Sequence, residues 1–263
     1  MLYQFENRSI TLIRKLLALL LSVALLVPFS SCQKESDVDL SEKIVAVEVN
    51  SNSALAARTI KDSVKEIKEI STEDGAVSLV EAKEADFVVL DEFQSALYIE
   101  NKRKIGVVKV LSFTTDYCAY LYNNQELLNK FNSEIIGLIE DGTIAEIKSS
   151  YKTGETFYPK LEKLSEKSPV LIVATDVVGF PYTDLTDDGS IVGIDIDILN
   201  IVANRLGYNL ELVVTTMVDA FNLLQKEEVD MVISGLVYEE TRNEVFDASI
   251  CYLSVDYYLH SRG

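Results

Sequence analysis

Two stretches of the chain show the same order of apolar and polar positions. Residues 76–90 and 220–234 align without a gap, and an aspartate falls at the same place in each, at Asp86 and Asp230. In both stretches a short run with helical spacing leads through that aspartate into a continuous apolar run, which is typical of a strand buried on both faces. The pattern indicates that the chain contains two related units.

The same alternation continues before each stretch. It predicts a strand and a helix at 44–49 and 54–65 in the first unit, and at 170–175 and 196–206 in the second. Each unit is therefore expected to be β-α-β-α-β, an α/β fold in which right-handed crossovers give a small, mostly parallel sheet flanked by helices. Ligands of such sheets bind beyond the carboxyl ends of the strands, so two facing units are expected to form a cleft.

Two residues mark the expected ends of the second unit's long helix. Asp195 is expected to cap its amino end, and Gly207 to end it in a left-handed turn. Between the two units the pattern predicts an extended segment at 116–122 and helices at 125–140 and 143–151. A polar stretch that follows them is predicted to be a linker.

The composition excludes one class of partner. The 263-residue chain has 42 acidic and 24 basic residues, a formal net charge of -18 and a hydrophobic content of 48%. That hydrophobic content is enough for a buried core. Binding to a phosphate backbone needs clustered lysine and arginine, so no nucleic acid partner is expected.

The first 31 residues are expected to be an export signal. Three basic residues precede an apolar run at 16–27, which is too short to span a bilayer comfortably and ends shortly before Cys32. A cysteine after small residues resembles a bacterial lipobox, although Phe29 stands where leucine is usual. Lipid on Cys32 would tether the protein to an extracytoplasmic membrane surface. Cleavage by ordinary signal peptidase, or an uncleaved anchor, is the alternative.

Export also permits disulfides, which makes Cys118 and Cys251 a candidate pair. Both lie in β-rich apolar runs, where a small buried thiol is the more common state of a cysteine. The sequence therefore favours two free thiols and leaves the pair open.

Several short motifs in the second unit resemble one family, spacing included. They are Thr175-Asp176, Pro181-Tyr182, Gly193 to Asp197, Ser234-Gly235-Leu236, Arg242 and Asp247 to Tyr252. Together they resemble the type II solute-binding proteins that deliver polar amino acids to ABC importers. The first unit is similar to the later part of that family, with 42–51 resembling the opening of lobe II, 86–91 its acidic strand end and 128–151 the terminal helices. The resemblance implies a two-lobed periplasmic-binding-protein-like fold with a permuted lobe order.

The expected divisions follow from that order. They are 1–31 for the lipoprotein signal peptide, 32–41 for a tether, 42–112 for lobe II, 113–151 for the C-terminal part of lobe I, 152–168 for a linker and 169–263 for the main part of lobe I. A circular permutation explains the order, and a remnant of two tandem copies, each half deleted, is the alternative.

A permuted chain is expected to cross between its lobes once, near Ser112 to Thr115, and so to have a looser hinge. That expectation holds unless Leu253 to His260 pairs with the segment at 116–122. The ends of the mature chain, near Asp39 and Gly263, are then expected to lie close together at a severed hinge.

The resemblance also implies a binding site for an amino acid. The ligand carboxylate needs a fixed cation and its ammonium a fixed anion, and Arg242 and Asp91 take these roles by resemblance. Asn50 and Ser51 form a turn before a helix whose N–H groups suit an anion, although Ser51 is equally expected to be a plain helix cap. The other candidates for ligand contact are Asp176, Phe180, Met217, Gly235, Leu236 and Val237.

Three positions depart from the family pattern. Val237 stands where serine or threonine is common, Met217 where an aromatic often stacks on the ligand, and Gly179 where another aromatic closes the pocket. Phe180 or Tyr182 compensates in one interpretation and is a core or turn aromatic in the other. The sequence therefore supports a site for the ligand's carboxylate and ammonium groups better than it supports a preference for any ligand side chain.

These expectations combine into a lipid-anchored, monomeric receptor that closes on an amino acid or a similar small solute and delivers it to an ABC permease, with no cofactor and no metal. A sensor component, a degenerate relative without transport and, less favoured, a cyclic-acid dehydratase-type enzyme are the alternatives. His260 is the only histidine, so one chain cannot assemble a Ser-His-Asp triad or a histidine metal site. Asp176 and Glu239 are the candidates for carboxylate acid–base chemistry, and the chain is expected not to be an enzyme.

Overall fold

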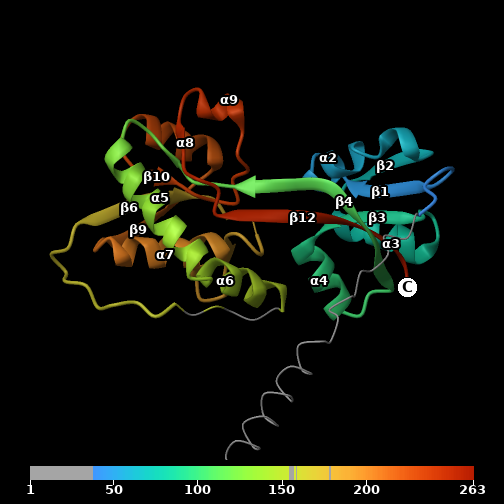
Figure 1. Ribbon diagram of the computed structural model, residues 1–263, viewed down its shortest axis with the longest axis horizontal. Helices are drawn as coiled ribbons and strands as arrows, with labels where there is room; N and C mark the ends of the chain where they lie inside the picture. The colour runs from blue at the N-terminus through green and yellow to red at the C-terminus, as the bar shows by residue number, and fades with distance from the viewer. Residues whose placement is uncertain (1–37, 154–156, 158, 178) are drawn as a thin grey trace, which may run out of the picture. The chain divides into compact units, whose positions relative to one another are not determined.

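Two five-stranded sheets organise the computed structural model of the protein, which describes residues 38–153, 157, 159–177 and 179–263 (Figure 1). The elements in chain order are β1 (Ile44–Glu48), α2 (Asn52–Arg58), a 3-10 turn (Lys61–Ser63), β2 (Glu66–Ile70), α3 (Glu73–Ala82), β3 (Phe87–Asp91), α4 (Glu92–Glu100), β4 (Ile105–Tyr117), β5 (Tyr120–Leu121), α5 (Gln125–Glu140), α6 (Thr143–Lys152), β6 (Val170–Thr175), β7 (Asp184–Leu185), β8 (Ile191–Val192), α7 (Ile194–Arg205), β9 (Asn209–Val214), α8 (Met217–Gln225), β10 (Met231–Val232), α9 (Glu240–Asn243), β11 (Asp247–Ala248) and β12 (Leu253–Arg262). The expected signal peptide and Cys32 lie outside the described residues. Within the part described, no helix combines the length and apolar character that a membrane span needs.

The first sheet has the strand order β2-β1-β3-β12-β4, with β1 parallel to both of its neighbours. Successive residues of a strand point to opposite faces, and the side chains follow that rule. Val45 and Val47 belong to the same buried cluster as the alanines of α2, whereas Ala46 packs in a second cluster with Val77 and Val80 of α3. Helices therefore cover both faces of this sheet.

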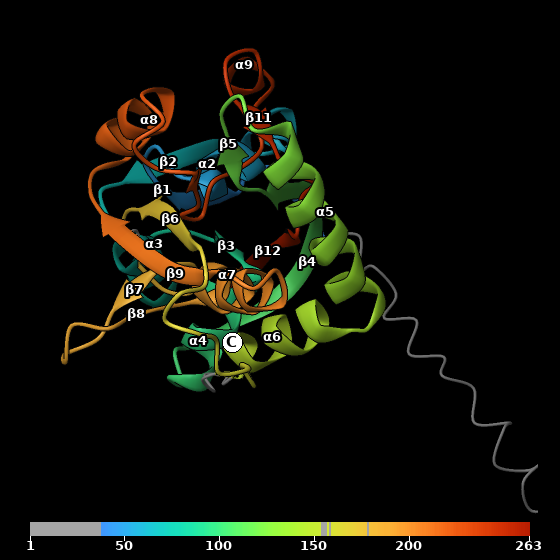
Figure 2. The same cartoon turned by 90° about the vertical axis from the view of Figure 1, so that its left-hand side faces the viewer.

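The second sheet has the order β11-β5-β10-β6-β9, with β6 parallel to β9 and β10. Leu171 and Val173 pack in the cluster that includes α7, while Ile172 and Ala174 face the cluster that includes α8. Figure 2 shows α7 and α8 on different sides of β6. The expected α/β fold, with two largely parallel sheets flanked by helices, is confirmed.

Elements with strong periodicity have the predicted limits. Strand β6 and helix α5 span the predicted residues, and Gly207, with a φ of 79°, follows α7 in the left-handed conformation. The helix predicted at 54–65 is shorter, because α2 ends at Arg58 and the Thr59 hydroxyl donates to the carbonyl of Ala56 at 2.7 Å.

Two strands, not one, connect the two sheets. β4 ends at Tyr117, next to the start of β5 in the second sheet, and β12 begins at Leu253, which pairs with Tyr117. β12 then runs antiparallel to β4 until Arg262 pairs with Ile105 in the first sheet (Figure 1). The prediction of a single crossing is therefore wrong, and the looser hinge expected with it does not follow. The exception stated for it applies, because Leu253 and Ser254 pair with Tyr117 and Asp116.

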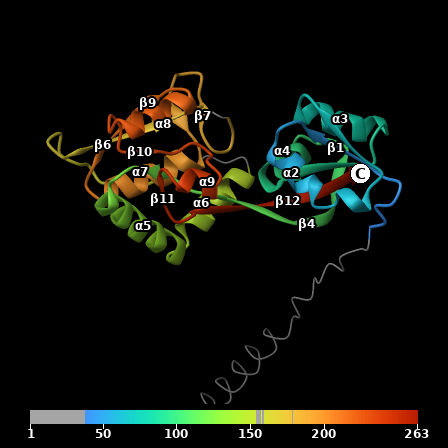
Figure 3. The ribbon, with the colours of Figure 1, turned by 90° about the horizontal axis from the view of Figure 1, so that it is seen from above.

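The two ends of the described chain lie at one end of the first sheet. Phe87 of β3 pairs with Val45 of β1 on one side and with Ser261 of β12 on the other. Adjacent strands are about 4.8 Å apart, so these two strands are about 10 Å apart. The C-terminus in Figure 3 is at this position. The two ends are close to each other, as expected. They do not lie at a hinge between the sheets, because β12 begins beside the second sheet at Leu253 and ends in the first sheet at Arg262.

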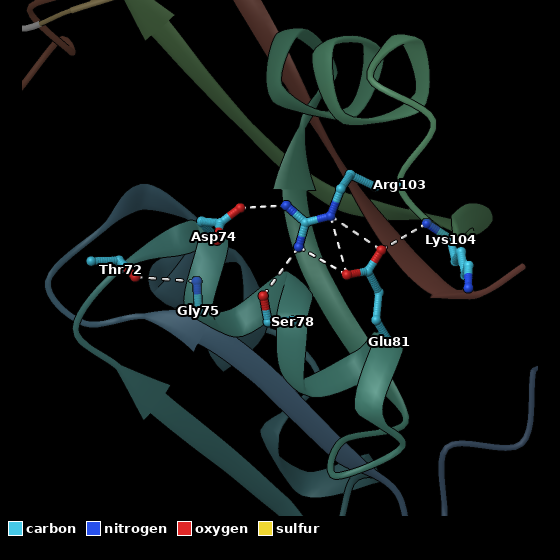
Figure 4. Close-up of polar contacts among 7 residues, drawn as sticks. All are labelled: Thr72, Asp74, Gly75, Ser78, Glu81, Arg103 and Lys104. Atoms are coloured by element: carbon cyan, nitrogen blue, oxygen red, sulfur yellow. Dashed lines mark hydrogen bonds and ion pairs between the residues drawn. The ribbon is translucent and has the colours of Figure 1, made fainter.

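Arg103 holds helix α3 in place on the first sheet. Its guanidinium bonds to Glu81 through Nε and Nη2, to Asp74 through Nη1 and to the Ser78 hydroxyl at 3.1 Å (Figure 4). Glu81 also accepts the N–H of Lys104 at 2.8 Å. One cation thus joins successive turns of α3 to the loop before β4. It fixes the helix whose first residue, Glu73, lies at the carboxyl end of the sheet.

Candidate functional site

Arg242 lies against aromatic side chains of the second sheet and of the helix α8. Its guanidinium carbon is 5.0 Å from the ring centroid of Tyr120 and 5.4 Å from that of Phe221. Nη1 donates to the carbonyl of Val237 at 3.0 Å, and Nη2 forms an ion pair with Glu239 at 3.2 Å. The side chain remains 22% exposed, so the cation is held in a fixed place and still reaches solvent.

Tyr120 arranges the loop around this cation. Its hydroxyl accepts the N–H of Glu239 at 3.0 Å and lies 3.4 Å from the carbonyl of Val237. Burial is the main cause that raises the pKa of this phenol to about 12, so it remains a donor. Sequence reasoning did not single out Tyr120, because its role depends on a loop far along the chain.

The turn at Gly235 is built by Asp195. This carboxylate is fully buried, accepts the N–H of Gly235 and accepts the hydroxyl of Tyr252 at 2.9 Å. Burial raises its pKa to about 6. The prediction that Asp195 caps α7 is wrong. Gly193 is the cap residue, with a φ of 136° and with Tyr182 O only 2.0 Å from where a Cβ would lie, so no other residue fits there.

Asp176 lies beside the same turn. Its carbonyl accepts the hydroxyls of Ser234 at 2.7 Å and Thr183 at 2.8 Å, while its carboxylate accepts the N–H of Val177 at 2.7 Å. The structure therefore brings Asp176 and Gly235 together through Ser234. Leu236 is buried, and Met217 is the first residue of α8 and partly buried.

Aromatic side chains also fill the space beside this turn. Tyr182 stacks on Tyr117 with ring centroids 4.6 Å apart and donates to its hydroxyl at 2.7 Å. It also meets Phe93 of α4 edge-on at 6.3 Å. The ring of Phe180 lies 6.0 Å from the ring of Tyr151. Tyr182 is thus the aromatic that contacts both the Gly235 turn and the first sheet's helix.

The predicted residues of the first sheet lie at the carboxyl ends of its strands. Asp91 ends β3 and caps α4, where its Oδ1 accepts the N–H groups of Phe93 and Gln94, both at 2.8 Å. Ser51 caps α2 by accepting the N–H of Ala54 at 3.1 Å, and Asn50 is exposed in a left-handed turn. The plain cap interpretation therefore applies to the Ser51 hydroxyl. No hydrogen bond or ion pair joins Asp91 to Arg242 among the described residues.

Two further carboxylates at this edge were missed by sequence reasoning. Glu73 is the first residue of α3, and Glu48 is the last residue of β1. Burial, followed by the charges of Asp91 and Glu48, raises the pKa of Glu73 to about 8. Burial is likewise the main cause that raises the pKa of Asp91 to about 6. The edge is therefore an acidic region in which positive charge is favoured.

Glu73→Gln is expected to stabilise the protein increasingly as pH rises. The folded-state pKa of about 8 lies above the ordinary value of 4.5, so the folded chain keeps a proton that the unfolded chain has released between these values. Stability from this group is thus complete below about pH 4.5 and is lost as pH rises through about 8. Relative to wild type, the variant's free energy of unfolding should be unchanged near pH 4 and higher by on the order of 2 kcal/mol near pH 9.

Urea denaturation across this pH range measures the difference. Glu84→Gln, at an exposed position just after the same helix, is the control and should leave the pH dependence unchanged. A Glu73→Gln difference that is the same near pH 4 and near pH 9 would contradict the expectation.

The cavities described in the structure lie elsewhere. One of about 330 Å³ is lined by Phe157, Pro159, Ile201 and Arg205, between the linker and the helices α6 and α7. None of the predicted site residues lines it. His260 is fully buried, bonds the Ser95 hydroxyl at 2.7 Å and has a pKa lowered by burial to about 4, so it is neutral at physiological pH. Across the described residues, no group of acidic, histidine or cysteine side chains is arranged to hold a metal ion.

Comparison with known proteins identifies one part of the chain. Residues 171–262 match the profile of bacterial extracellular solute-binding proteins, family 3. This match confirms the predicted resemblance for the second unit, and proteins of this family are in general not enzymes. No curated protein sequence matches the chain.

Solved structures of binding proteins align with a part of the chain. An ancestral arginine-binding protein bound to arginine is 29% identical, with a TM-score of 0.29, over 30% of this chain and 34% of that chain. Substrate binding domain 2 of Lactococcus lactis GlnP in open conformation is 29% identical, with a TM-score of 0.29, over 33% and 37%. An arginine 3rd transport system periplasmic binding protein from Legionella pneumophila is 26% identical, with a TM-score of 0.27, over 29% and 34%. The aligned part is thus about a third of the length of these relatives.

Proposed function

We propose, from the match of residues 171–262 to family 3 of the bacterial extracellular solute-binding proteins, that this chain binds a small solute that carries a carboxylate and an amine, such as an amino acid. One observation carries the proposal: the guanidinium of Arg242 lies over two neighbouring aromatic rings, Tyr120 and Phe221, and its side chain remains partly exposed. The rings hold the cation in place, and the planar fork of an arginine binds a carboxylate through two charge-assisted hydrogen bonds.

Glu239 occupies the place that the solute carboxylate would take. It pairs with Arg242 at 3.2 Å, but its side chain is 53% exposed. An exposed ion pair contributes only about 0 to 1 kcal/mol, so a bidentate solute carboxylate displaces it at small cost. The Gly235 turn, fixed by Asp195, supplies the neighbouring main-chain groups.

The acidic edge of the first sheet is proposed to bind the amine. Both helix N–H groups bond to Oδ1 of Asp91, which leaves Oδ2 for the solute ammonium. Glu48 adds negative charge nearby. Solute that touches both sheets favours the closed arrangement by its greater affinity for that state.

We further propose that the protein is a monomer, anchored through lipid on Cys32 at an extracytoplasmic membrane surface, and that it delivers the solute to an ABC permease. The family of the matched profile is extracellular, which supports this location. If the permease is a partner, loaded protein should stimulate solute uptake into vesicles that contain it. A sensor component would bind solute and leave that uptake unchanged.

A circular permutation is proposed as the origin of the chain order. Each sheet receives one strand from the other half of the chain, β12 in the first and β5 in the second, at the same place beside the third parallel strand. The nearness of Val45 and Ser261 supports it, since a short connection would restore the family's order. A remnant of two tandem copies is the alternative origin of the same order.

Arg242→Ala is expected to lower the affinity for the solute at least about 100-fold, because two hydrogen bonds to a charged group are worth about 3 to 6 kcal/mol. Titration calorimetry of the purified full chain with L-arginine, L-glutamine and the other common amino acids measures it. Arg242→Lys keeps the charge without the planar edge and should bind with intermediate affinity.

Arg58→Ala is the matched control, because Arg58 is an exposed arginine in a surface ion pair with Glu69. It should bind as wild type does. Equal urea midpoints for the three variants would show that folding is unchanged. No heat from any amino acid with wild-type protein, or equal affinity for wild type and Arg242→Ala, would refute the proposed function.

A further inference from the structure

Two thiols lie side by side where the two connecting strands leave the second sheet. Cys118 directly follows the last residue of β4, and Cys251 precedes β12 by two positions. The N–H of Tyr252 donates to the carbonyl of Tyr117 at 3.0 Å. This hydrogen bond joins the residue after Cys251 to the residue before Cys118, which places the two cysteines next to each other across the strand pair. Both thiols are free.

The two cysteines differ in access and in acidity. Cys118 is fully buried, whereas Cys251 is partly exposed. Interaction with the neighbouring Cys118 thiol lowers the pKa of the Cys251 thiol, and the same interaction, with burial, raises the pKa of the Cys118 thiol. A thiolate, not a thiol, attacks a disulfide, so Cys251 is the nucleophile of the pair and Cys118 the resolving group.

We propose that Cys118 and Cys251 form a reversible disulfide, a covalent modification site at the base of the two connecting strands. The oxidant is a small-molecule or protein disulfide. The Cys251 thiolate attacks one of its sulfur atoms and releases the first thiol. The Cys118 thiol then loses its proton and displaces the second thiol from Cys251. In total two cysteine thiols are oxidised to one disulfide, and the oxidant is reduced to two thiols.

The disulfide would constrain the part of the second sheet that holds Arg242. The N–H of Cys118 donates to the carbonyl of Leu236 at 3.0 Å, and Tyr120, two residues on, lies under the guanidinium of Arg242. A disulfide would therefore tie the Gly235–Val237 turn and the Tyr120 strand to the start of β12. This consequence rests on the proposed function, whereas formation of the bond does not. We expect oxidation to change the affinity for the solute at least about threefold.

Peptide mapping of the purified full chain tests the bond. The folded protein is treated with oxidised glutathione, and its free thiols are then blocked with iodoacetamide before digestion. The expected product joins the Cys118 and Cys251 peptides, with a mass about 2 Da below the sum of the reduced peptides, and dithiothreitol restores both thiols. The oxidised protein should also melt at a higher temperature than the reduced protein.

Serine variants supply the matched controls. Cys251→Ser should leave Cys118 unmodified under native conditions, because Cys118 is buried. Cys118→Ser should instead accumulate glutathione on Cys251, since the resolving thiol is gone; Cys118→Ala serves if the serine variant does not fold. The proposal is refuted if wild-type protein keeps both thiols alkylatable, carries glutathione on Cys251 without resolution, or links either cysteine only to Cys32 or to a second molecule. A linked pair in protein that binds no amino acid would refute the proposed function alone.

Discussion

Replacing both Lys148 and Lys152 with methionine is expected to lower the free energy of unfolding by about 3 to 5 kcal/mol. The reason is Glu92, the first residue of α4, whose side chain is only 3% exposed. Lys148 pairs with its Oε1 at 2.5 Å, and Lys152 pairs with Oε2. Without them the buried carboxylate keeps, among the residues that the structure describes, only the N–H of Asp256, at 3.4 Å. An uncompensated buried charge is what makes a broken buried pair costly.

Removing the charge of Glu92 instead is expected to lower the free energy of unfolding much less. Glu92→Gln leaves two lysines that are 25% and 37% exposed and turn readily toward water, so we expect a loss of about 1 kcal/mol. Lys130→Met is the control, because Lys130 pairs with Glu126 on the surface of α5 and should cost no more than about 0.5 kcal/mol. Urea denaturation measures all three. A double lysine variant as stable as the Glu92→Gln protein would show that the carboxylate does not depend on these cations.

Asp195→Ala is expected to lower the free energy of unfolding by about 3 kcal/mol, because it leaves two buried donors without an acceptor, at about 1 to 3 kcal/mol each. The donors are the N–H of Gly235 and the hydroxyl of Tyr252. Asp187→Ala, at an exposed turn position of the same unit, should change stability by less than about 0.5 kcal/mol.

A double-mutant cycle separates the two donors. Tyr252→Phe removes one donor, so the double variant Asp195→Ala/Tyr252→Phe should be less destabilised than the sum of the single variants, by about 1 kcal/mol. Because Asp195 fixes the Gly235 turn, Asp195→Ala should also weaken solute binding in calorimetry at temperatures where it remains folded. Strict additivity of the two substitutions would show that Asp195 does not serve Tyr252.

Elements with regular periodicity could be predicted from the sequence. β6 and α5 have the predicted limits, because burial on a sheet or a helix face follows spacing between near neighbours in the chain. Gly207 could be placed for a similar reason, since a left-handed residue after a helix favours glycine. The match of residues 171–262 to the solute-binding family depended on motifs of the same local kind.

The errors come from residues whose partners are distant in the chain. Asp195 is a residue type that often caps helices, and it lies at the right position for a cap. Its carboxylate oxygens instead accept hydrogen bonds from Gly235 and Tyr252. The part of the chain from Leu253 was assigned a strand, but its pairing with both β3 and β4 makes it a second connection between the sheets. Spacing along the sequence contains no information about either partner.

By itself, the sequence determined two related β-α-β-α-β units, the acidic and aromatic residues at their strand ends, and the family that the second unit resembles. These follow from local spacing, because each depends on residues a few positions apart. Only the tertiary structure decided which groups meet: Tyr120 under Arg242, Glu73 beside Asp91, and the thiols of Cys118 and Cys251. The physical reason is that hydrogen bonds, ring contacts and shifted pKa values act over a few ångströms in space, and strand pairing sets those distances.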